Sequence, residues 1–286
     1  MHPKDGDILS QAAPEAGDRT PSLWQGFFIE TQSAPEAIAA ALAEASRGLV
    51  DREALVELTA LAVVAGEHLL VVGPPGTAKS EAVRRVSRVL GGQYFEYLLG
   101  RFTEPSEIFG PIDLQKLREG IVQTETAGML PEAEIAFLDE VFLGSTAILN
   151  TLLGLLNERQ FRRGHTRIEC PLKVCVGATN QLPDDDALQA FADRFLLRYF
   201  AESIADPQLE TLLESGWTLR PIEQAPVGLD VLDALGQRAR QADLTKVRPA
   251  LSQAVRTLRA AGIALSDRRV VKTQRVVAAT GKNRRR

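Results

Sequence analysis

A glycine-rich turn followed by Lys-Ser is the stretch of this sequence whose residue types point most directly to a chemistry. It runs from Leu69 to Ser80, LLVVGPPGTAKS, as a short apolar segment, a turn and the start of a helical pattern. In such a turn the backbone N–H groups surround anionic oxygens, and the following helix adds the positive end of its dipole. We therefore expect a phosphate-binding loop, although an ordinary strand-turn-helix connection has the same outline.

The side chains of this loop are of the types that nucleoside triphosphate chemistry requires. Lys79 is expected to reach the terminal phosphates, and the Ser80 hydroxyl is expected to ligate Mg²⁺. The strict pattern has glycine before the lysine, whereas this sequence has Ala78, which is tolerable if that residue has helical dihedrals. The residues expected to contact the nucleotide are Gly73, Pro74, Pro75, Gly76, Thr77, Ala78, Lys79, Ser80 and Glu81.

Further polar residues directly follow two other apolar segments. Asp139 and Glu140 come after an apolar run at 135–138, and Asn180 comes after another at 173–178. We expect Asp139 to hold Mg²⁺ through water and Glu140 to polarise the attacking water as a general base. Asn180 is expected to position that water near the γ-phosphate, and a turn-forming asparagine is the alternative.

Three arginines could supply the cation that phosphoryl transfer needs at the developing γ-charge. Arg194, in the segment ADRF, is expected to act on the nucleotide of a neighbouring subunit, and the alternative is a solvated arginine paired with Asp193. Arg268, in the segment SDRR, is expected to reach the γ-phosphate from a second domain. Arg269 is the competing choice, and a surface arginine at a helix start is the alternative.

The pattern of apolar segments predicts an α/β scaffold for these residues. Strand-like segments at 68–72, 94–98, 135–138, 173–178 and 196–200 alternate with helical patterns, and two helices precede them, one from Ser33 and one capped by Asp51. This alternation predicts a parallel sheet covered on both faces, with ligands at the carboxyl ends of the strands. From about Asp206 the pattern is helical, with candidates at 208–214, 229–241, 248–261 and 267–279.

The chain is expected to have three parts. Residues 1–22 have the composition of a disordered tail, residues 23–204 form the nucleotide-binding α/β domain, and residues 205–286 form a helical lid domain. Two segments with alternating polar and apolar residues, Gly120–Gly128 and Gln160–Glu169, predict β-hairpins inserted into the α/β domain. They are either surface loops or elements that project toward a pore or a substrate.

Composition narrows the class of protein. The 286 residues are 45% hydrophobic and 24% charged, as in a globular protein long enough to bury a core. A net charge of −4 argues against a general nucleic-acid binder. No apolar run reaches the roughly 18 residues that a membrane span needs. Cys170 and Cys175 are expected to be buried, reduced thiols, which suits a cytoplasmic location.

Taken together, these motifs resemble the AAA+ ATPases and, within them, the MoxR family. GPPGTAKS as Walker A, IAFLDE as Walker B, GATN, ADRF and SDRR occur in the family's order. The Ala-Lys-Ser of the loop, RFTEPSEIFGPIDLQ at 101–115, GMLPEAEIAFLDE at 128–140 and ILNTLLGLLNERQFRRG at 148–164 resemble the RavA-type branch. The resemblance covers about 24–280 and implies a three-layer α/β/α P-loop domain followed by a small all-α lid.

The same resemblance implies a mechanism and partners. ATP and Mg²⁺ would be the cofactors, bound between the subunits of a hexameric ring, with an arginine finger given in trans. The implied role is chaperone-like remodelling or metal-site maturation of a protein partner, usually a von Willebrand factor A-domain protein. RavA-type chains continue past the SDRR helix, whereas this sequence ends at Arg286, so a truncated lid is expected.

Two other functions fit parts of the pattern. A nucleic-acid-translocating or helicase-like ring is the first, because four residues make the second predicted hairpin basic: Arg162, Arg163, His165 and Arg167. The acidic balance of the chain counts against it. A nucleotide switch that does not hydrolyse ATP is the second, and the complete set of catalytic residue types argues against it.

Overall fold

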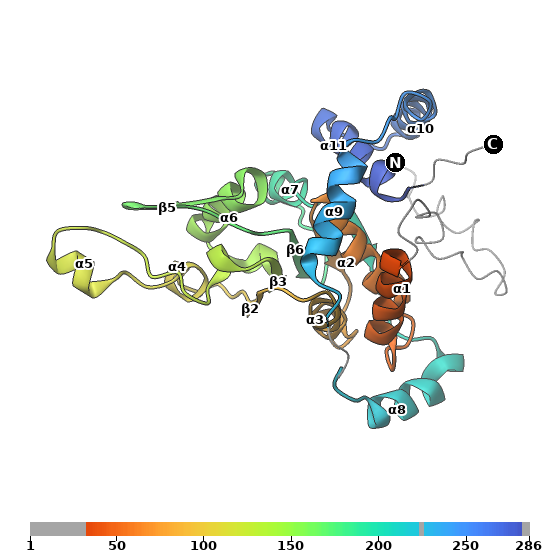
Figure 1. Ribbon diagram of the computed structural model, residues 1–286, viewed down its shortest axis with the longest axis horizontal. Helices are drawn as coiled ribbons and strands as arrows, with labels where there is room; N and C mark the ends of the chain where they lie inside the picture. The colour runs from red at the N-terminus through yellow and green to blue at the C-terminus, as the bar shows by residue number, and fades with distance from the viewer. Residues whose placement is uncertain (1–32, 223–225, 282–286) are drawn as a thin grey trace, which may run out of the picture.

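A five-stranded parallel sheet forms the centre of the molecule (Figure 1). The computed structural model describes residues 33–222 and 226–281. The strands are β1 (Leu69–Val72), β2 (Tyr94–Leu98), β3 (Ile135–Asp139), β6 (Val174–Thr179) and β7 (Leu197–Phe200), in the order β2-β3-β6-β1-β7. Every residue of β1 and β6 is buried, which is why these strands are apolar throughout rather than alternating.

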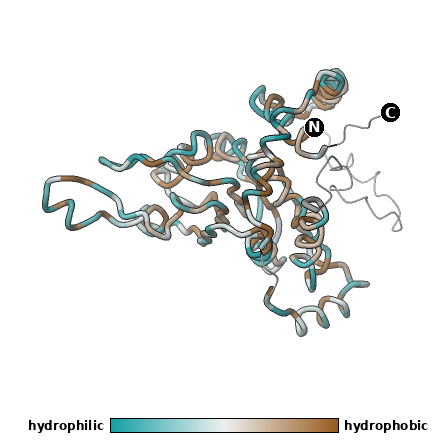
Figure 2. The backbone as a smooth tube through the Cα atoms, in the orientation of Figure 1, coloured by the Kyte–Doolittle hydropathy of each residue, from teal (hydrophilic) through white to brown (hydrophobic). Residues whose placement is uncertain are grey.

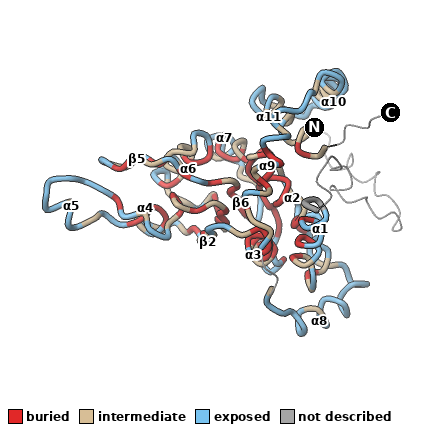
Figure 3. Tube along the Cα trace, in the orientation of Figure 1, coloured by how far each residue is buried: buried red, intermediate tan, exposed pale blue. Residues whose placement is uncertain are grey.

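Helices cover both faces of this sheet. On one face lie α1 (Ser33–Ser46), α2 (Glu53–Ala65) and α3 (Lys79–Leu90), and on the other lie α4 (Pro105–Phe109), α6 (Thr146–Glu158) and α7 (Asp186–Ala192). Alternate residues of β1 serve the two cores, since Leu69 and Val71 join the first cluster while Leu70 and Val72 join the second. Figure 3 shows this buried centre in red. The predicted three-layer α/β/α fold is confirmed.

The strands of the sheet are parallel and in register, so they begin at one edge of the sheet and end at the opposite edge. Leu69 of β1 lies level with Val176 of β6 and with Leu197 of β7, all three strands running in parallel. The carboxyl ends of the strands therefore lie at one edge of the sheet, and the segments that lead into them lie at the opposite edge.

Only one of the two predicted hairpin insertions is a hairpin. The strands β4 (Gln160–Arg163) and β5 (Thr166–Glu169) pair antiparallel, as expected. The prediction for Gly120–Gly128 is wrong, because within the described residues the strand pairing of this segment is limited to one isolated bridge between Ile112 and Thr124. That preceding chain folds instead into α5 (Leu114–Arg118), since the Asp113 carboxylate caps the N–H groups of its first turn. Both insertions project to the same side (Figure 1).

Helices follow the last strand, and they differ in how well they pack. After β7 come the short turn η3 (Asp206–Gln208) and the helices α8 (Leu209–Thr218), α9 (Leu229–Arg240), α10 (Arg248–Ala260) and α11 (Asp267–Ala279). Two other short turns, η1 (Leu130–Glu132) and η2 (Val141–Leu143), flank β3 earlier in the chain. Helices α9 and α11 pack on α2 and on each other. Helices α8 and α10 bury no residue (Figure 3), although hydrophobic positions recur along α8 (Figure 2).

Several smaller expectations can be compared with the structure. The predicted strands and the four predicted late helices agree with the observed ones within a few residues. The expected cap at Asp51 is wrong, since Arg52 occupies the N-cap position of α2 and Asp51 has a left-handed φ of 55°. Cys170 and Cys175 are free and buried, as expected. The expected tail at 1–22 and the terminal arginines at 284–286 lie outside the described residues.

The described residues contain no helix that is both long enough and apolar enough to cross a lipid bilayer.

Candidate nucleotide site

The loop between β1 and α3 is closely packed against the strand ends. The Gly73 N–H donates to Thr179 O at 3.0 Å, and a Cβ at position 73 would lie 2.1 Å from Ala201 O, so only glycine fits there. Lys79 is 7% exposed, and its ammonium donates to Gly73 O at 2.7 Å and to Pro74 O at 3.0 Å. These bonds hold the lysine charge inside the loop, at the edge where phosphates are expected.

Ala78 has a conformation that the sequence did not indicate. Its φ of 57° and ψ of 28° are left-handed, so the condition under which an alanine would be tolerated without strain, ordinary helical dihedrals, is not met. A residue with a Cβ loses about 1–2 kcal/mol in this region relative to the right-handed one. Glu81, expected near the nucleotide, pairs with Arg84 of the same helix at 2.6 Å.

Asp139, Glu140 and Asn180 meet at the carboxyl ends of β3 and β6. The Asn180 Nδ2 donates to Glu140 Oε1 at 2.6 Å, and the Glu140 N–H donates to Asp139 Oδ1 at 3.0 Å. Glu140 has a left-handed φ of 49°, which turns the chain directly after Asp139. The edge of the sheet thus carries two carboxylates and an amide, and with the Ser80 hydroxyl it offers the hard oxygen donors that Mg²⁺ prefers.

Arg194 and Arg268 lie at the opposite edge of the sheet. Arg194 precedes β7, and the lid helix α11, which begins beside Arg268, bonds to the same segment. Because β7 and β1 are parallel and in register, Leu196 lies level with His68, five residues before the phosphate-binding loop. Five residues of strand span roughly 16 Å. Neither arginine is therefore placed to serve the loop of its own chain.

The contacts of Asp193 show which of the two lid arginines, Arg268 or Arg269, is bound to the sheet domain. Its carboxylate accepts a hydrogen bond from the Ser266 hydroxyl at 2.8 Å and lies 3.5 Å from the Arg269 guanidinium. Arg269 also donates to Leu196 O at 3.0 Å. Arg269 is thus committed to the contact between lid and sheet, and Asp193 pairs with it rather than with Arg194.

Arg194 and Arg268 are near enough for their like charges to interact, and we call them the arginine pair. The Arg194 Nη1 donates to Ala190 O at 3.2 Å, whereas its buried Nε has no hydrogen-bond partner within the described residues. Burial lowers the pKa of Arg194, and the neighbouring charge of Arg268 lowers it further. Within residues 33–222 and 226–281, neither arginine makes an ion pair with a carboxylate. Two adjacent guanidinium groups of this kind favour the approach of an anion.

A buried ion-pair cluster holds the lid at this edge. Glu67, two residues before the start of β1, has no exposed surface and accepts from Lys272 Nζ at 2.7 Å and from Arg275 Nη1 at 3.0 Å. A second pair joins Lys173, before β6, to Asp233 of α9 at 2.7 Å. The sequence contains no local signal for these contacts, since each joins residues far apart along the chain.

His68 lies next to Glu67 in the chain and is also buried. Its Nδ1 accepts from the Cys175 N–H at 3.0 Å, which leaves the proton of the neutral ring on Nε2, 3.0 Å from Leu156 O and 2.5 Å from Arg159 Nη1. Burial lowers the pKa of His68 well below its usual range, and the charge of Arg159 lowers it further. His68 is therefore a neutral histidine that ties β1 to β6 and to the end of α6.

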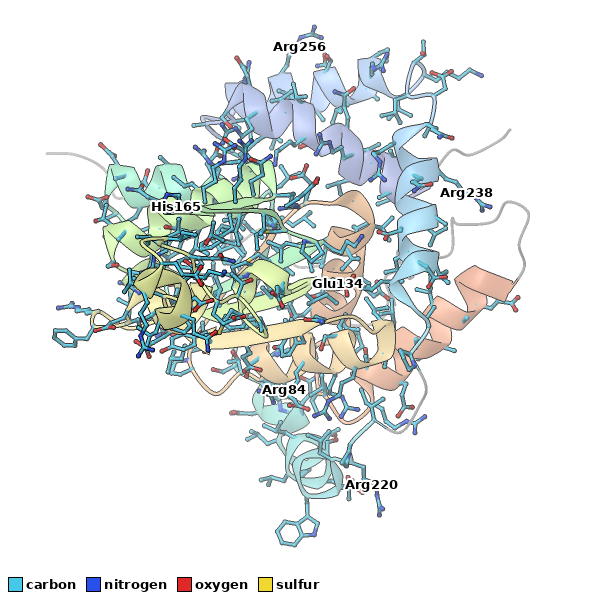
Figure 4. All side chains as sticks on the ribbon, turned by 60° about the vertical axis from the view of Figure 1, so that its left-hand side comes forward. Arg84, Glu134, His165, Arg220, Arg238 and Arg256 are labelled. Atoms are coloured by element: carbon cyan, nitrogen blue, oxygen red, sulfur yellow. The ribbon has the colours of Figure 1, made fainter. Side chains whose placement is uncertain are left out.

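The two insertions are joined to each other. The N–H of His165, the residue labelled in Figure 4, donates to Val122 O at 2.8 Å. The Val122 N–H donates to His165 Nδ1 at 3.1 Å. The Thr124 N–H donates to Thr166 Oγ1 at 2.7 Å. Within the basic hairpin, Arg162 already pairs with Glu158 at 3.2 Å. The insertions therefore form one projecting unit.

Comparison with known proteins gives a family. The model of a protein family described as the MoxR domain in the MoxR-vWA-beta-propeller ternary systems matches residues 36–235. Two uncharacterized proteins of Methanocaldococcus jannaschii, MJ0812 and MJ0079, are 34% and 33% identical over 230 residues, which are 80% of this chain. The chaperone MoxR1 of Mycobacterium tuberculosis is 25% identical over 227 residues, 73% of this chain and 58% of its own length.

A solved structure gives the fold. A protein of Cytophaga hutchinsonii, described provisionally as an ATPase, superposes with a TM-score of 0.69 at 17% identity, over 87% of this chain and 81% of its own. This chain spans about three fifths of the length of the two archaeal relatives, 61% and 60%.

Proposed function

This chain belongs to the MoxR family of AAA+ ATPases, and on that premise we propose that it hydrolyses ATP in a ring of copies and remodels a protein partner. The observation that carries the proposal is the division of its charged residues between two edges of one sheet. Lys79, Asp139 and Glu140 lie at one edge, and the pair Arg194 and Arg268 lies at the other. Each hydrolysis site is then completed by two copies.

The chain's own residues divide the chemistry as follows. The loop from Gly73 to Glu81 binds the phosphates of ATP, and Ser80 and Asp139 supply oxygens to Mg²⁺, Asp139 partly through water. Bound Mg²⁺ would neutralise charge that develops on the phosphates. Glu140 accepts the proton of the attacking water, and the Asn180 amide, now 2.6 Å from Glu140 Oε1, orients that carboxylate.

The arginine pair supplies the missing cation in trans. Arg194 and Arg268 of one copy stabilise the charge on the γ-phosphate held by its neighbour. Within the described residues no carboxylate lies within ion-pair distance of the Arg194 guanidinium, and this supports the role, since the charge is then left for a group outside the chain. A closed ring of six copies gives every nucleotide such a neighbour.

A von Willebrand factor A-domain protein is the partner we propose, on the basis of the ternary systems after which the matched family is described. The joined insertions and the exposed helix α8 offer projecting surfaces for contact with such a partner. The proposal extends to the RavA-type branch on the shared Ala-Lys-Ser of the loop. A nucleic-acid partner is less favoured, because Arg162 of the basic hairpin already forms an ion pair with Glu158.

The test is phosphate release by the purified chain at high protein concentration with MgATP. We expect turnover by the wild type, no nucleotide binding by Lys79→Ala, and binding without turnover by Glu140→Gln. Affinity capture with the ATP-loaded Glu140→Gln protein then identifies the partner. A wild type that binds ATP but releases no phosphate would instead support a nucleotide switch.

A further inference from the structure

A buried arginine behind the phosphate-binding loop has no role in the site as described so far. Arg52, at the N-cap position of α2, is 2% exposed. Within the described residues its nearest carboxylate oxygen is Asp51 Oδ2, 3.7 Å away on a side chain that is 62% exposed. A buried guanidinium without a close counter-ion is costly unless its N–H donors are used.

Arg52 uses its donors on backbone carbonyls. Nε donates to Thr77 O at 2.8 Å, Nη2 donates to Glu202 O at 2.6 Å, and Nη1 donates to Asp51 O. These carbonyls belong to the phosphate-binding loop, to the chain that leaves β7 toward α8, and to the turn before α2. A planar guanidinium with five donors can hold three carbonyls in fixed directions, whereas an ammonium is a point charge.

Two of these carbonyls lie at strained backbone. Thr77 O belongs to the peptide that joins Thr77 to Ala78, and Ala78 is left-handed with φ 57°. Asp51 is itself left-handed with φ 55°, and Tyr199 Oη donates to the same Asp51 carbonyl at 3.4 Å. Residues with a Cβ avoid this region and remain there only where the surroundings hold them.

We propose that Arg52 is a positioning residue that holds the Thr77–Ala78 peptide in its phosphate-binding orientation. By fixing Thr77 O it also fixes the direction of the Ala78 N–H, on the other side of the same planar peptide. The bond to Glu202 O ties this peptide to the segment that leads to α8. The inference rests on the proposed nucleotide site and adds a residue that does not touch the nucleotide.

The experiment is calorimetric titration of MgADP onto five proteins. They are the wild type, Arg52→Lys, Ala78→Gly, the double variant with both changes, and Arg85→Lys. The last is a matched control, because Arg85 is 3% exposed and also donates to backbone carbonyls, among them Ala45 O at 2.8 Å. Its ion-pair contact with the segment 73–81 is to the Glu81 side chain, at 3.9 Å, and not to a carbonyl of the loop. Thermal melts of all five separate loss of stability from loss of binding.

We expect Arg52→Lys to bind MgADP about ten-fold more weakly, since a lost charge-assisted hydrogen bond changes a binding constant by roughly that factor or more. Ala78→Gly in that background should restore most of the affinity, because glycine adopts a positive φ without being held. The affinity of Ala78→Gly alone is the reference for the double variant, so that the effect of Arg52→Lys is measured with alanine and with glycine at position 78. Arg85→Lys should melt earlier and yet bind within about two-fold of the wild type.

Three results would overturn the inference. They are wild-type affinity in Arg52→Lys, failure of glycine at position 78 to improve binding in the double variant, and an equal loss of affinity in Arg85→Lys. A wild type that does not bind MgADP at all would instead overturn the proposed function, and this inference with it. The two failures are therefore distinguishable, because one appears in the variants and the other in the unmodified chain.

Discussion

Removing the lid's buried ion pair should separate nucleotide binding from turnover. Lys272→Met keeps most of the side-chain length and deletes the ammonium that lies 2.7 Å from the fully buried Glu67 carboxylate. The pair fastens α11 to the edge of the sheet opposite the phosphate-binding loop. We therefore expect the substitution to loosen the lid, and with it Arg268, without disturbing the loop in the same chain.

The size of the effect follows from what remains around Glu67. Breaking a buried ion pair by removing one partner costs about 3–5 kcal/mol, because an uncompensated charge is left behind. Here Arg275 remains 3.0 Å from the other carboxylate oxygen, although its side chain is 56% exposed. We therefore expect a smaller loss, ~1.5 kcal/mol, which corresponds to about a ten-fold shift toward an undocked lid.

The assay combines urea unfolding, MgADP titration and phosphate release. Lys272→Met should lower the unfolding free energy and the turnover rate, and leave the MgADP affinity within about two-fold. Arg259→Met is the control, since its ion-pair partner Asp267 in the same lid is 97% exposed and such pairs contribute little. Equal losses of affinity and turnover in Lys272→Met would refute the reasoning, because the lid would then close over its own nucleotide.

Three further predictions concern the interior and the insertions. The pKa of His68 in the folded protein lies well below the usual value near 6.5, so as the pH falls the unfolded chain takes up the proton first. The unfolding free energy of the wild type should therefore fall by up to ~1.4 kcal/mol for each pH unit below that value. His68→Asn lacks this pH dependence, so urea unfolding should show a smaller difference in unfolding free energy between the two proteins at pH 5 than at pH 7. An equal difference at both pH values would contradict the burial of a neutral imidazole. Burial raises the pKa of the Cys175 thiol to about 12, so a thiol reagent at pH 8 should modify it only after unfolding, and rapid labelling of the native protein would show otherwise. Gly164→Ala should separate the two insertions, because its Cβ would lie 2.7 Å from Val122 O at a φ of +58°; unchanged hydrogen exchange at the Val122 and His165 amides would count against that contact.

The parts of the fold that follow from local pattern could be predicted from the sequence. The strands are buried on both faces, so their apolar runs stand out between turns, and the helices have caps and periodic apolar faces. The hairpin predicted at Gly120–Gly128 was wrong because an alternating pattern does not by itself supply a strand to pair with, and the chain before it folds into α5. The cap predicted at Asp51 was wrong, and the Arg52 side chain that binds the Asp51 carbonyl has its other partners 25 and 150 residues away, where no local pattern can indicate them.

The candidate site divides in the same way. The residues at the carboxyl edge, Lys79, Asp139, Glu140 and Asn180, are specified by short motifs at strand ends. The position of Arg194 also follows from the sequence order, since ADRF leads into a parallel strand and so lies at the other edge. The pairing of Arg194 with Arg268 could not be predicted, because it depends on where the lid docks, which is set by Glu67 and Asp193 through contacts that no local pattern encodes.

Complementation between two inactive variants tests the central claim most directly. Arg194→Ala and Glu140→Gln are each expected to bind ATP without hydrolysing it. In a mixture, an intact Glu140 from one variant should meet an intact Arg194 from the other, and phosphate release should return to a measurable fraction of the wild-type rate. No recovery in assemblies shown by mass measurement to contain both variants would contradict a hydrolysis site shared between copies.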